Sequence, residues 1–489
     1  MNTGTFATTT GWLGTFGTNG TPAINAAWPR TVRQTSTGTS VSSTFTVTQW
    51  WYRYEPGYNG FQTVGSVYNT STGTDGISTW LVTTTAIITP ISTTANWNSI
   101  REGQFNTIVT TTGGITTVNY TCIDTTSFYV TFEASLIPTF ITTGVYGAGK
   151  KERAAYYVMI FTFTGSTFTT TSTVVTSYTT GTTSCTIYSQ FVTSVDTQMT
   201  TWLGVMTGVM VKTPTFPFHV WTPVVHSESP TAGSVITAGT ITKTTVYTIT
   251  RWVTPFTAEA SVIFYPTIAV ICVTTVIYTS TTTLAQIDTK VIIAYSSIGH
   301  MGVCITGAFA NNVTGVEGSY TTSTSHGFIS PGTFMAVGGI TYDRYHTRVT
   351  TYFQGLLAFM PVFAFYTIVT SFANIGTPTS GNFTGEFMST TGAFQRSPIF
   401  AATASFSMTT SAAYQMKTTS RTTGGVKAPY TQATQNTADS HSAQTPSDIT
   451  SRESVTMTTT ITPCTTIGIY PNFITQSTHW NTSSVIYFC

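Results

Sequence analysis

The chain has 489 residues, of which only 7% are charged, and its formal net charge is +2. Soluble proteins usually carry about 25% charged residues, so this composition indicates either a membrane protein or a mucin-like polar chain. Aromatic residues make up 13% of the chain, which argues against a mucin-like stalk. The nearly neutral charge gives no reason to expect nucleic-acid binding.

Threonine stands where leucine would be expected. Leucine occurs at only seven positions, although it is normally among the commonest residues, and threonine fills apolar runs such as residues 137–143, IPTFITT. Two explanations stay open: the threonines are genuine, or CUN leucine codons have been translated with a mitochondrial code that reads them as threonine. We therefore treat such threonines as leucine when helices are assigned, and we assign no chemistry to them.

Long apolar segments then follow one another along the chain, with short charged connections between them. They predict an all-α, polytopic membrane protein of about 14 transmembrane helices, most of them long enough for a hydrocarbon core about 30 Å thick. The most polar stretch, residues 430–454, predicts an exposed loop before the last helix. The predicted spans are residues 5–24, 35–50, 78–97, 106–123, 125–146, 155–180, 198–225, 230–251, 258–280, 290–309, 317–341, 354–374, 378–417 (as two pieces) and 455–478.

Four ionisable residues lie well inside these spans, away from their ends, namely Glu133, Lys212, Lys243 and Glu386. A charge at the centre of a membrane helix costs at least about 2.5–3.5 kcal/mol, so such residues are functional candidates. Any one of them could belong to a structural ion pair. Two acids and two bases together favour a path for protons.

Helix breakers lie beside two of these charges. Residues 212–217, KTPTFP, place two prolines directly after Lys212, and residues 376–381, GTPTSG, precede Glu386. A single proline kink is compatible with simple packing. One interrupted helix in each half of the chain is typical of inverted-repeat transporters, so we predict two inverted-repeat halves with broken helices.

Histidines and cysteines add little that is specific. His219, His226, His300 and His326 lie in or beside apolar spans, where a lone histidine is more often a packing residue; His300 and His326 could extend a proton relay. The histidine spacing predicts no metal site. The six cysteines form no CxxC pair and are expected to be reduced, buried thiols.

Several segments carry a family resemblance. Residues 211–243, VKTPTFPFHVWTPVVHSESPTAGSVITAGTITK, and residues 288–302, DTKVIIAYSSIGHMG, resemble the hallmark segments of the antiporter-like subunits of respiratory complex I, the NADH:ubiquinone oxidoreductase. Residues 342–348, YDRYHTR, follow at the expected place, and residues 381–387, GNFTGEF, are similar to the chain 4 type. The resemblance covers most of residues 75–425.

The resemblance implies roles for the buried charges. Glu133 matches the family's glutamate that pairs with Lys212, and Lys243 matches the central lysine that links two half-channels. Glu386 matches a terminal acid on the exit side.

Two further points follow from the same resemblance. His300 and His326 match positions near a hydrated central axis. One departure is Ala285, where the family usually has arginine.

The resemblance also implies a setting and a division of the chain. It implies a multi-pass subunit of the mitochondrial inner membrane that couples NADH oxidation and ubiquinone reduction to proton pumping, beside other membrane-arm subunits and lipids including cardiolipin. It implies no cofactor in this chain, since NADH, FMN, iron–sulfur clusters and ubiquinone act elsewhere in the complex. The expected divisions are residues 1–104 (N-terminal helices and interfacial loop), 105–250 (first antiporter-like repeat), 251–425 (second repeat) and 426–489 (polar loop and C-terminal helix).

Two alternatives stay open. A stand-alone multi-subunit cation/proton antiporter would share the buried lysines, although residues 342–348 favour complex I. A threonine-rich surface protein would be glycosylated, and the lysine and glutamate pattern inside apolar spans argues against it.

Overall fold

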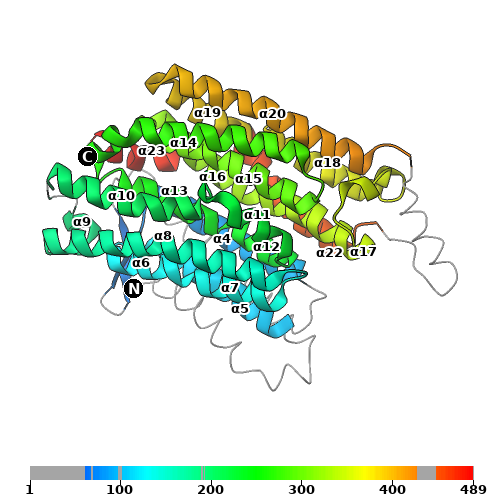
Figure 1. Cartoon of the computed structure of the whole chain (residues 1–489), viewed down its shortest axis with the longest axis horizontal. Coiled ribbons are helices and arrows are strands. Elements are labelled where there is room, and N and C mark those ends of the chain that lie inside the picture. Colours follow the sequence, from blue (N-terminus) through cyan, green and yellow to red (C-terminus); the bar gives the residue numbers. More distant parts are fainter. Residues whose placement is uncertain are drawn as a thin grey trace.

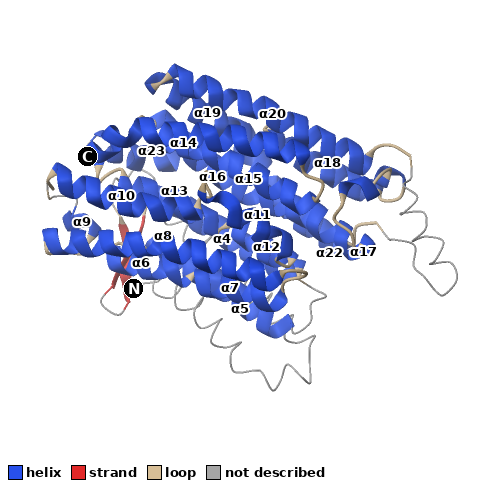
Figure 2. Cartoon of the chain, in the orientation of Figure 1, coloured by secondary structure: helices blue, strands red, loops and turns tan. Residues whose placement is uncertain are grey.

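The computed structural model describes residues 61–67, 70–96, 102–188, 191, 193–426 and 448–487. Within these residues the chain forms a bundle of helices that lie side by side (Figure 1). A single two-stranded antiparallel sheet, β1 (Gln62–Val67) with β2 (Thr70–Thr74), is the exception in this described part (Figure 2). The all-α prediction is confirmed apart from this hairpin, and the predicted spans 5–24 and 35–50 lie outside the described residues.

The helices of the first half begin at good capping residues. Asp75, Asp124 and Ser194 each accept a hydrogen bond from a backbone N–H of the first turn, which satisfies a donor that has no partner within the helix. The elements are α4 (Gly76–Ala95), α5 (Glu102–Thr121), α6 (Thr125–Ala134), α7 (Leu136–Tyr146), α8 (Lys151–Thr180), α9 (Cys185–Tyr188), α10 (Val195–Lys212), η1 (Phe218–Val220), α11 (Trp221–Glu228), α12 (Thr231–Gly239), η2 (Ile241–Lys243), α13 (Thr244–Thr248) and η3 (Ile249–Val253).

The second half repeats this pattern, with Asp288, Asn312 and Ser380 as capping residues. Its elements are α14 (Ala258–Ala285), α15 (Thr289–Ala308), α16 (Val313–Thr333), η4 (Phe334–Ile340), α17 (Thr341–Tyr345), η5 (Thr350–Tyr352), η6 (Leu356–Ala358), α18 (Pro361–Ile375), α19 (Gly381–Arg396), α20 (Pro398–Thr423), α22 (Ser451–Ile469) and α23 (Asn472–Tyr487).

Both predicted helix breaks are present. Helix α10 ends at Lys212, and α11 begins only at Trp221, after the two prolines. Helix α18 ends at Ile375, Gly376 adopts φ 81°, and α19 begins at Gly381. The α12–α13 span is also interrupted, because the 3₁₀ turn η2 separates its two helices.

Three predicted spans need correction. The span 125–146 is two helices, α6 and α7, with Pro138 in the first turn of α7, where proline needs no donor. The helix expected over 354–374 begins at Pro361 instead, at the first helical position that proline favours. The span 455–478 is also two helices, because α22 ends at Ile469 and the chain turns at Tyr470 and Pro471.

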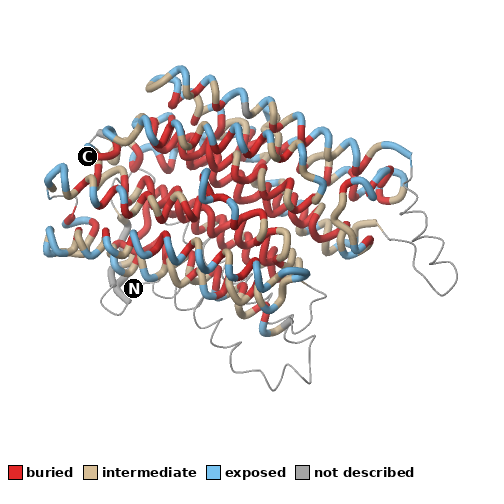
Figure 3. The backbone as a smooth tube through the Cα atoms, viewed as in Figure 1, coloured by how far each residue is buried: buried red, intermediate tan, exposed pale blue. Residues whose placement is uncertain are grey.

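Helix α16 is the centre of the bundle. It packs against α4, α12, α15, α18, α19, α22 and α23, and the residues from Gly315 to Thr333 are all buried. Figure 3 shows buried backbone concentrated along the middle of the molecule. Close approach depends on glycine: a Cβ atom at Gly318 would lie 2.3 Å from the backbone nitrogen of Ser389 on α19, so small residues let the two backbones meet.

By length and composition, α14 and α15 are the two helices of the described chain that are long and apolar enough to cross a membrane, and α18 is a shorter apolar helix. Threonine lowers the hydropathy of the others. In α8, Thr164 Oγ1 donates to the Ile160 carbonyl at 2.7 Å and Thr171 Oγ1 to the Thr167 carbonyl at 3.0 Å. Such hydroxyls are satisfied within their own helix, so the threonine content does not prevent the helices from forming.

The five cysteines of the described residues are buried and free, as the sequence predicts: Cys122, Cys185, Cys272, Cys304 and Cys464. The sixth, Cys489, lies outside the described residues.

Candidate functional site

An acid and a base meet where α6 and α10 end. Lys212 Nζ lies 3.3 Å from Glu133 Oε1 and donates to the Phe132 carbonyl at 2.5 Å. The same ammonium lies 3.3 Å from the centre of the Phe132 ring, an arrangement that stabilises a cation. The Lys212 side chain is 6% exposed and that of Glu133 19%. The two residues that the sequence predicts to pair therefore lie within ion-pair distance of each other.

Lys243 lies at the interruption between α12 and α13. Its Nζ lies 2.8 Å from His326 Nδ1 on α16 and donates to the Ala238 carbonyl at 2.6 Å. The 3₁₀ turn η2 replaces regular α-helix at this point, which allows the Ala238 carbonyl to accept from a side chain. A charged lysine has donors and no acceptor, so in that state Lys243 Nζ donates to His326 Nδ1.

The second half carries its own acid–base pair. His300 Nδ1 on α15 lies 2.5 Å from Glu386 Oε1 on α19, and the two side chains are 5% and 2% exposed. The His300 and His326 rings are 5.5 Å apart between centroids. Lys243, His326, His300 and Glu386 thus form one line of neighbouring ionisable side chains, which we call the central line.

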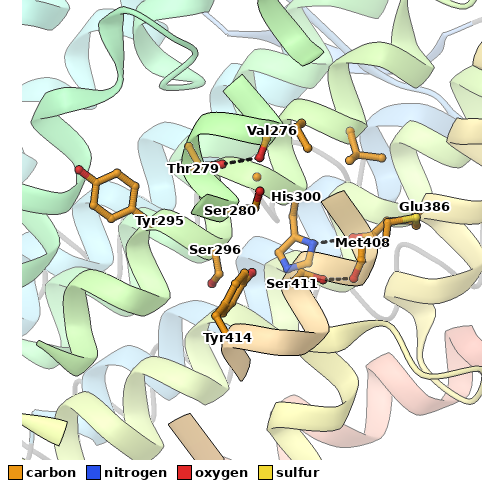
Figure 4. Close-up of a pocket in the computed structure, with 12 residues that line it drawn as sticks. Val276, Thr279, Ser280, Tyr295, Ser296, His300, Glu386, Met408, Ser411 and Tyr414 are labelled. Carbon is orange, nitrogen blue, oxygen red and sulfur yellow. Dashed lines mark hydrogen bonds and ion pairs between the residues drawn. The ribbon is translucent and has the colours of Figure 1, made fainter. Parts of the chain in front are cut away.

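A small cavity opens beside the end of the central line (Figure 4). Its volume is about 20 Å³, which is enough for one water molecule. Hydroxyl groups from α14, α15 and α20 surround it together with His300 and Glu386. They belong to Thr279, Ser280, Tyr295, Ser296, Ser411 and Tyr414.

Two histidine nitrogens on the central line have no hydrogen-bond partner in the protein. These are Nε2 of His300 and Nε2 of His326, and both are buried. Buried polar groups are nearly always hydrogen-bonded, to protein or to ordered water. The two nitrogens are therefore suited to contact with water molecules along the bundle interior.

Sequence reasoning underrated two further basic residues. His226 is buried, stacks on Phe334 with 4.8 Å between ring centroids, and has no partner for either ring nitrogen. Lys290 is 5% exposed and donates from Nζ to the Ser229 carbonyl at 2.9 Å. Lys290 was hard to recognise because it follows the start of its helix by one residue. His219, in contrast, packs against aromatic rings away from the central line.

In the part of the chain that the structure describes, no group of three or more His, Cys, Asp or Glu side chains is arranged to hold a metal ion.

A helical bundle with broken helices and a buried line of acids and bases defines a class: membrane subunits that translocate protons or other cations. Comparison with known proteins agrees with this class. Residues 123–411 match the family model "NADH:quinone oxidoreductase/Mrp antiporter, TM".

Curated relatives narrow the assignment. The chain is 45% identical to NADH-ubiquinone oxidoreductase chain 4 of Candida albicans, over 88% of this chain and 89% of that protein. It is 43% identical to the chain 4 protein of Yarrowia lipolytica, over 85% and 83% of the two chains. The chain therefore belongs to the NADH-ubiquinone oxidoreductase chain 4 family, and the resemblance seen in the sequence is confirmed.

Solved structures show the same fold at lower identity. A chain of respiratory complex I from Thermus thermophilus matches with a TM-score of 0.83 and 22% identity, over 93% of this chain and 94% of that one. A chain of the Mrp complex from Dietzia matches with a TM-score of 0.83 and 14% identity, over 100% and 98%. At these identities the likeness concerns the fold alone, and it supports the predicted fold class.

Proposed function

We propose that this chain translocates protons as a membrane-arm subunit of respiratory NADH:ubiquinone oxidoreductase, in the mitochondrial inner membrane. The observation that carries the proposal is the central line. Lys243, His326, His300 and Glu386 come from four different helical segments, yet each lies next to its neighbour in the line. Isolated buried charges are costly in a membrane, so a contiguous set of them favours a transport role.

The geometry suggests how a proton moves. A charged Lys243 gives a proton to His326 Nδ1, which breaks one N–H bond and forms another. Water between the two imidazole rings carries a proton from His326 Nε2 to His300, whose Nδ1 then protonates Glu386 Oε1 at 2.5 Å. The cavity beside Glu386 has room for the water that accepts the proton next.

Glu133 and Lys212 have a different role in the proposal. Their separation of 3.3 Å means that the charge of either side chain strongly affects the proton affinity of the other. A change of charge at this pair would alter the electrostatic potential felt along the bundle. We assign Lys212 as a proton-loading residue and Glu133 as the residue that tunes it.

The proposal extends to the setting of the chain. Residues 105–250 and 251–425 act as the two antiporter-like repeats, with residues 1–104 and 426–489 flanking them. NADH, FMN, iron–sulfur clusters and ubiquinone act in other subunits, so redox energy reaches this chain through its contacts in the membrane arm. Cardiolipin is among the lipids expected around it.

A stand-alone cation/proton antiporter subunit is the alternative. The Mrp complex from Dietzia shares the fold at 14% identity, whereas the chain 4 proteins share up to 45% of their residues with this chain over most of its length. The comparison favours complex I. Co-purification of the chain with quinone-reducing subunits distinguishes the two.

The test is to break the central line at its middle. The His326→Gln variant removes a titratable ring and keeps a polar side chain, so proton pumping by the purified complex in proteoliposomes should fall at least about 100-fold, in the range of general acid–base effects. His219→Gln is the matched control, because His219 is buried on the same chain but lies off the line. Normal pumping by an assembled His326→Gln complex would refute the proposal.

A further inference from the structure

A second acid–histidine pair lies outside the central line. Glu317, in the second turn of α16, has its Oε1 2.7 Å from Nδ1 of His479 on α23. The Glu317 side chain is 8% exposed and that of His479 is 55% exposed. The pair therefore joins a buried carboxylate in a membrane helix directly to the surface of the described chain.

The pair is distinct from the central line in its position on α16. Nine residues separate Glu317 from His326, which is two and a half turns at 3.6 residues per turn, so the two side chains project from opposite sides of the helix. Helix α19 packs on the neighbouring turn, because a Cβ atom at Gly385 would lie 2.3 Å from the backbone nitrogen of Thr322. Glu317 thus lies about one helical turn from the level of Glu386.

Other titratable groups near this end of α16 already have partners. Asp75, which caps α4, pairs with Arg251 of η3. Glu386 of α19 pairs with His300 of α15. Tyr320, one turn from Glu317, has its hydroxyl against Thr250. His479 is the side chain that pairs with Glu317 in the described structure.

The exposed side of the pair lies near a helix end and carries an exposed tryptophan. Trp480 is adjacent to His479 and 50% exposed, and Glu317 lies in the second turn of α16. Tryptophan and tyrosine are enriched where the headgroups of a membrane meet water. His479 is therefore placed where protons from water can reach its ring, while Glu317 faces the bundle.

We propose that Glu317 and His479 form a proton-exchange site, through which the second half of the chain exchanges protons with water at this boundary. In the exchange, the Nδ1–H bond of a charged His479 breaks and an O–H bond forms on Glu317, or the reverse, and no electrons move. Water then restores the protonation state of the exposed imidazole. The inference rests on the proposed function, because it adds an exchange site to that proton path.

The experiment uses the purified complex in proteoliposomes and measures proton pumping per assembled complex across about pH 6 to 9. Glu317→Gln and His479→Gln keep polar side chains but cannot exchange protons in this range. Both should lower the pumping rate about 5-fold and flatten its dependence on pH. Glu317→Asp keeps a titratable carboxyl and should restore most of the rate.

Ser477→Ala is the matched control. Ser477 lies on the same helix and accepts a hydrogen bond from Trp80 Nε1 at 2.7 Å, so the variant weakens the docking of α23 without removing a titratable group. If Glu317→Gln and His479→Gln pump like Ser477→Ala at every pH, the pair only holds α23 in place and the inference is wrong.

The His326→Gln variant, measured in parallel, separates the two proposals. Loss of pumping in His326→Gln together with normal pumping in Glu317→Gln and His479→Gln would overturn this inference alone. Normal pumping in His326→Gln would overturn the proposed function.

Discussion

Two acid–base pairs of the described chain, Glu133–Lys212 and His300–Glu386, lie beside corresponding helix breaks but differ in how they are connected. In the first half, Lys212 is the last residue of α10 and Glu133 is its partner. In the second half, Glu386 lies six residues into α19, after the break, and His300 is its partner. The first pair places its base before a break, and the second pair places its acid after one.

The helix ends explain this difference in part. A helix C-terminus carries partial negative charge and favours a cation, and an N-terminus favours an anion. Lys212 lies in the last turn of α10, where a cation is favoured. Glu386 lies beyond the first turn of α19, so its negative charge depends on His300 rather than on the helix end.

The pairs also differ in their surroundings. Lys212 contacts the carbonyl and the ring of Phe132 as well as Glu133. These three residues therefore form a group of their own. Glu386 contacts His300, which in turn neighbours His326 and Lys243. The first pair is therefore suited to storing a charge, and the second to passing a proton along.

The largest effect is expected from Lys212→Ala. The variant removes the loaded base and leaves Glu133 without its counter-charge, so proton pumping and the coupled oxidation of NADH should fall by more than about 100-fold, in the range of general acid–base effects. Pumping into proteoliposomes measures this, with native gel electrophoresis to confirm that the complex assembles. Near-normal pumping would show that the first pair stores no charge that the mechanism needs.

A somewhat smaller loss is expected from Glu386→Gln. The amide can still meet His300 but cannot accept a proton, so the pumping rate should fall about 100-fold, at the lower end of general acid–base effects. Glu386→Asp keeps the carboxyl and should retain most of the rate. If Asp and Gln at this position behave alike, the carboxylate is a structural partner of His300 and the contrast between the two halves is lost.

A smaller loss still is expected from Glu133→Ala, because the variant keeps the base at Lys212. The two residues act as one unit, so the double variant Glu133→Ala with Lys212→Ala should pump no worse than Lys212→Ala alone. Residues in contact usually show coupling energies of about 0.5–3 kcal/mol in such cycles. Additive losses would mean that Glu133 acts independently of Lys212.

Sequence reasoning identified the members of both pairs and, through the resemblance, the pairing of Glu133 with Lys212, but not the contacts along the central line. Glu133, Lys212, Lys243 and Glu386 could be recognised because ionisable residues are rare inside apolar spans. The contacts of Lys243 with His326 and of His300 with Glu386 join residues 83 and 86 positions apart. Such contacts arise from the packing of α15, α16 and α19, which no local pattern specifies.

Two further features were not predicted because the sequence around them gave little signal. Glu317 was placed at the boundary of its predicted span, where a charge needs no explanation, although α16 begins at Val313. The break between α22 and α23 was missed because apolar and threonine residues continue on both sides of Pro471. Pro471 itself was the one signal in the sequence for a helix break at this place.

The abundance of threonine gives a prediction about the residues of the natural subunit rather than about its activity. If the excess comes from the translation of CUN codons, peptide mass spectrometry of the isolated subunit will find the mass of leucine at positions such as Thr139, Thr222 and Thr237. Thr222 and Thr237 are buried, and an apolar residue there would add to the packing between helices. Threonine masses at all three positions would show that the threonines are genuine.

The most direct test of the central line is the number of protons pumped per NADH oxidised in a Lys243→Gln variant. Lys243 is 1% exposed and lies at the head of the line, in contact with His326. If the line carries protons, the assembled complex should pump fewer protons per NADH than the wild-type complex. An unchanged number of protons per NADH, at a normal rate, would contradict the account.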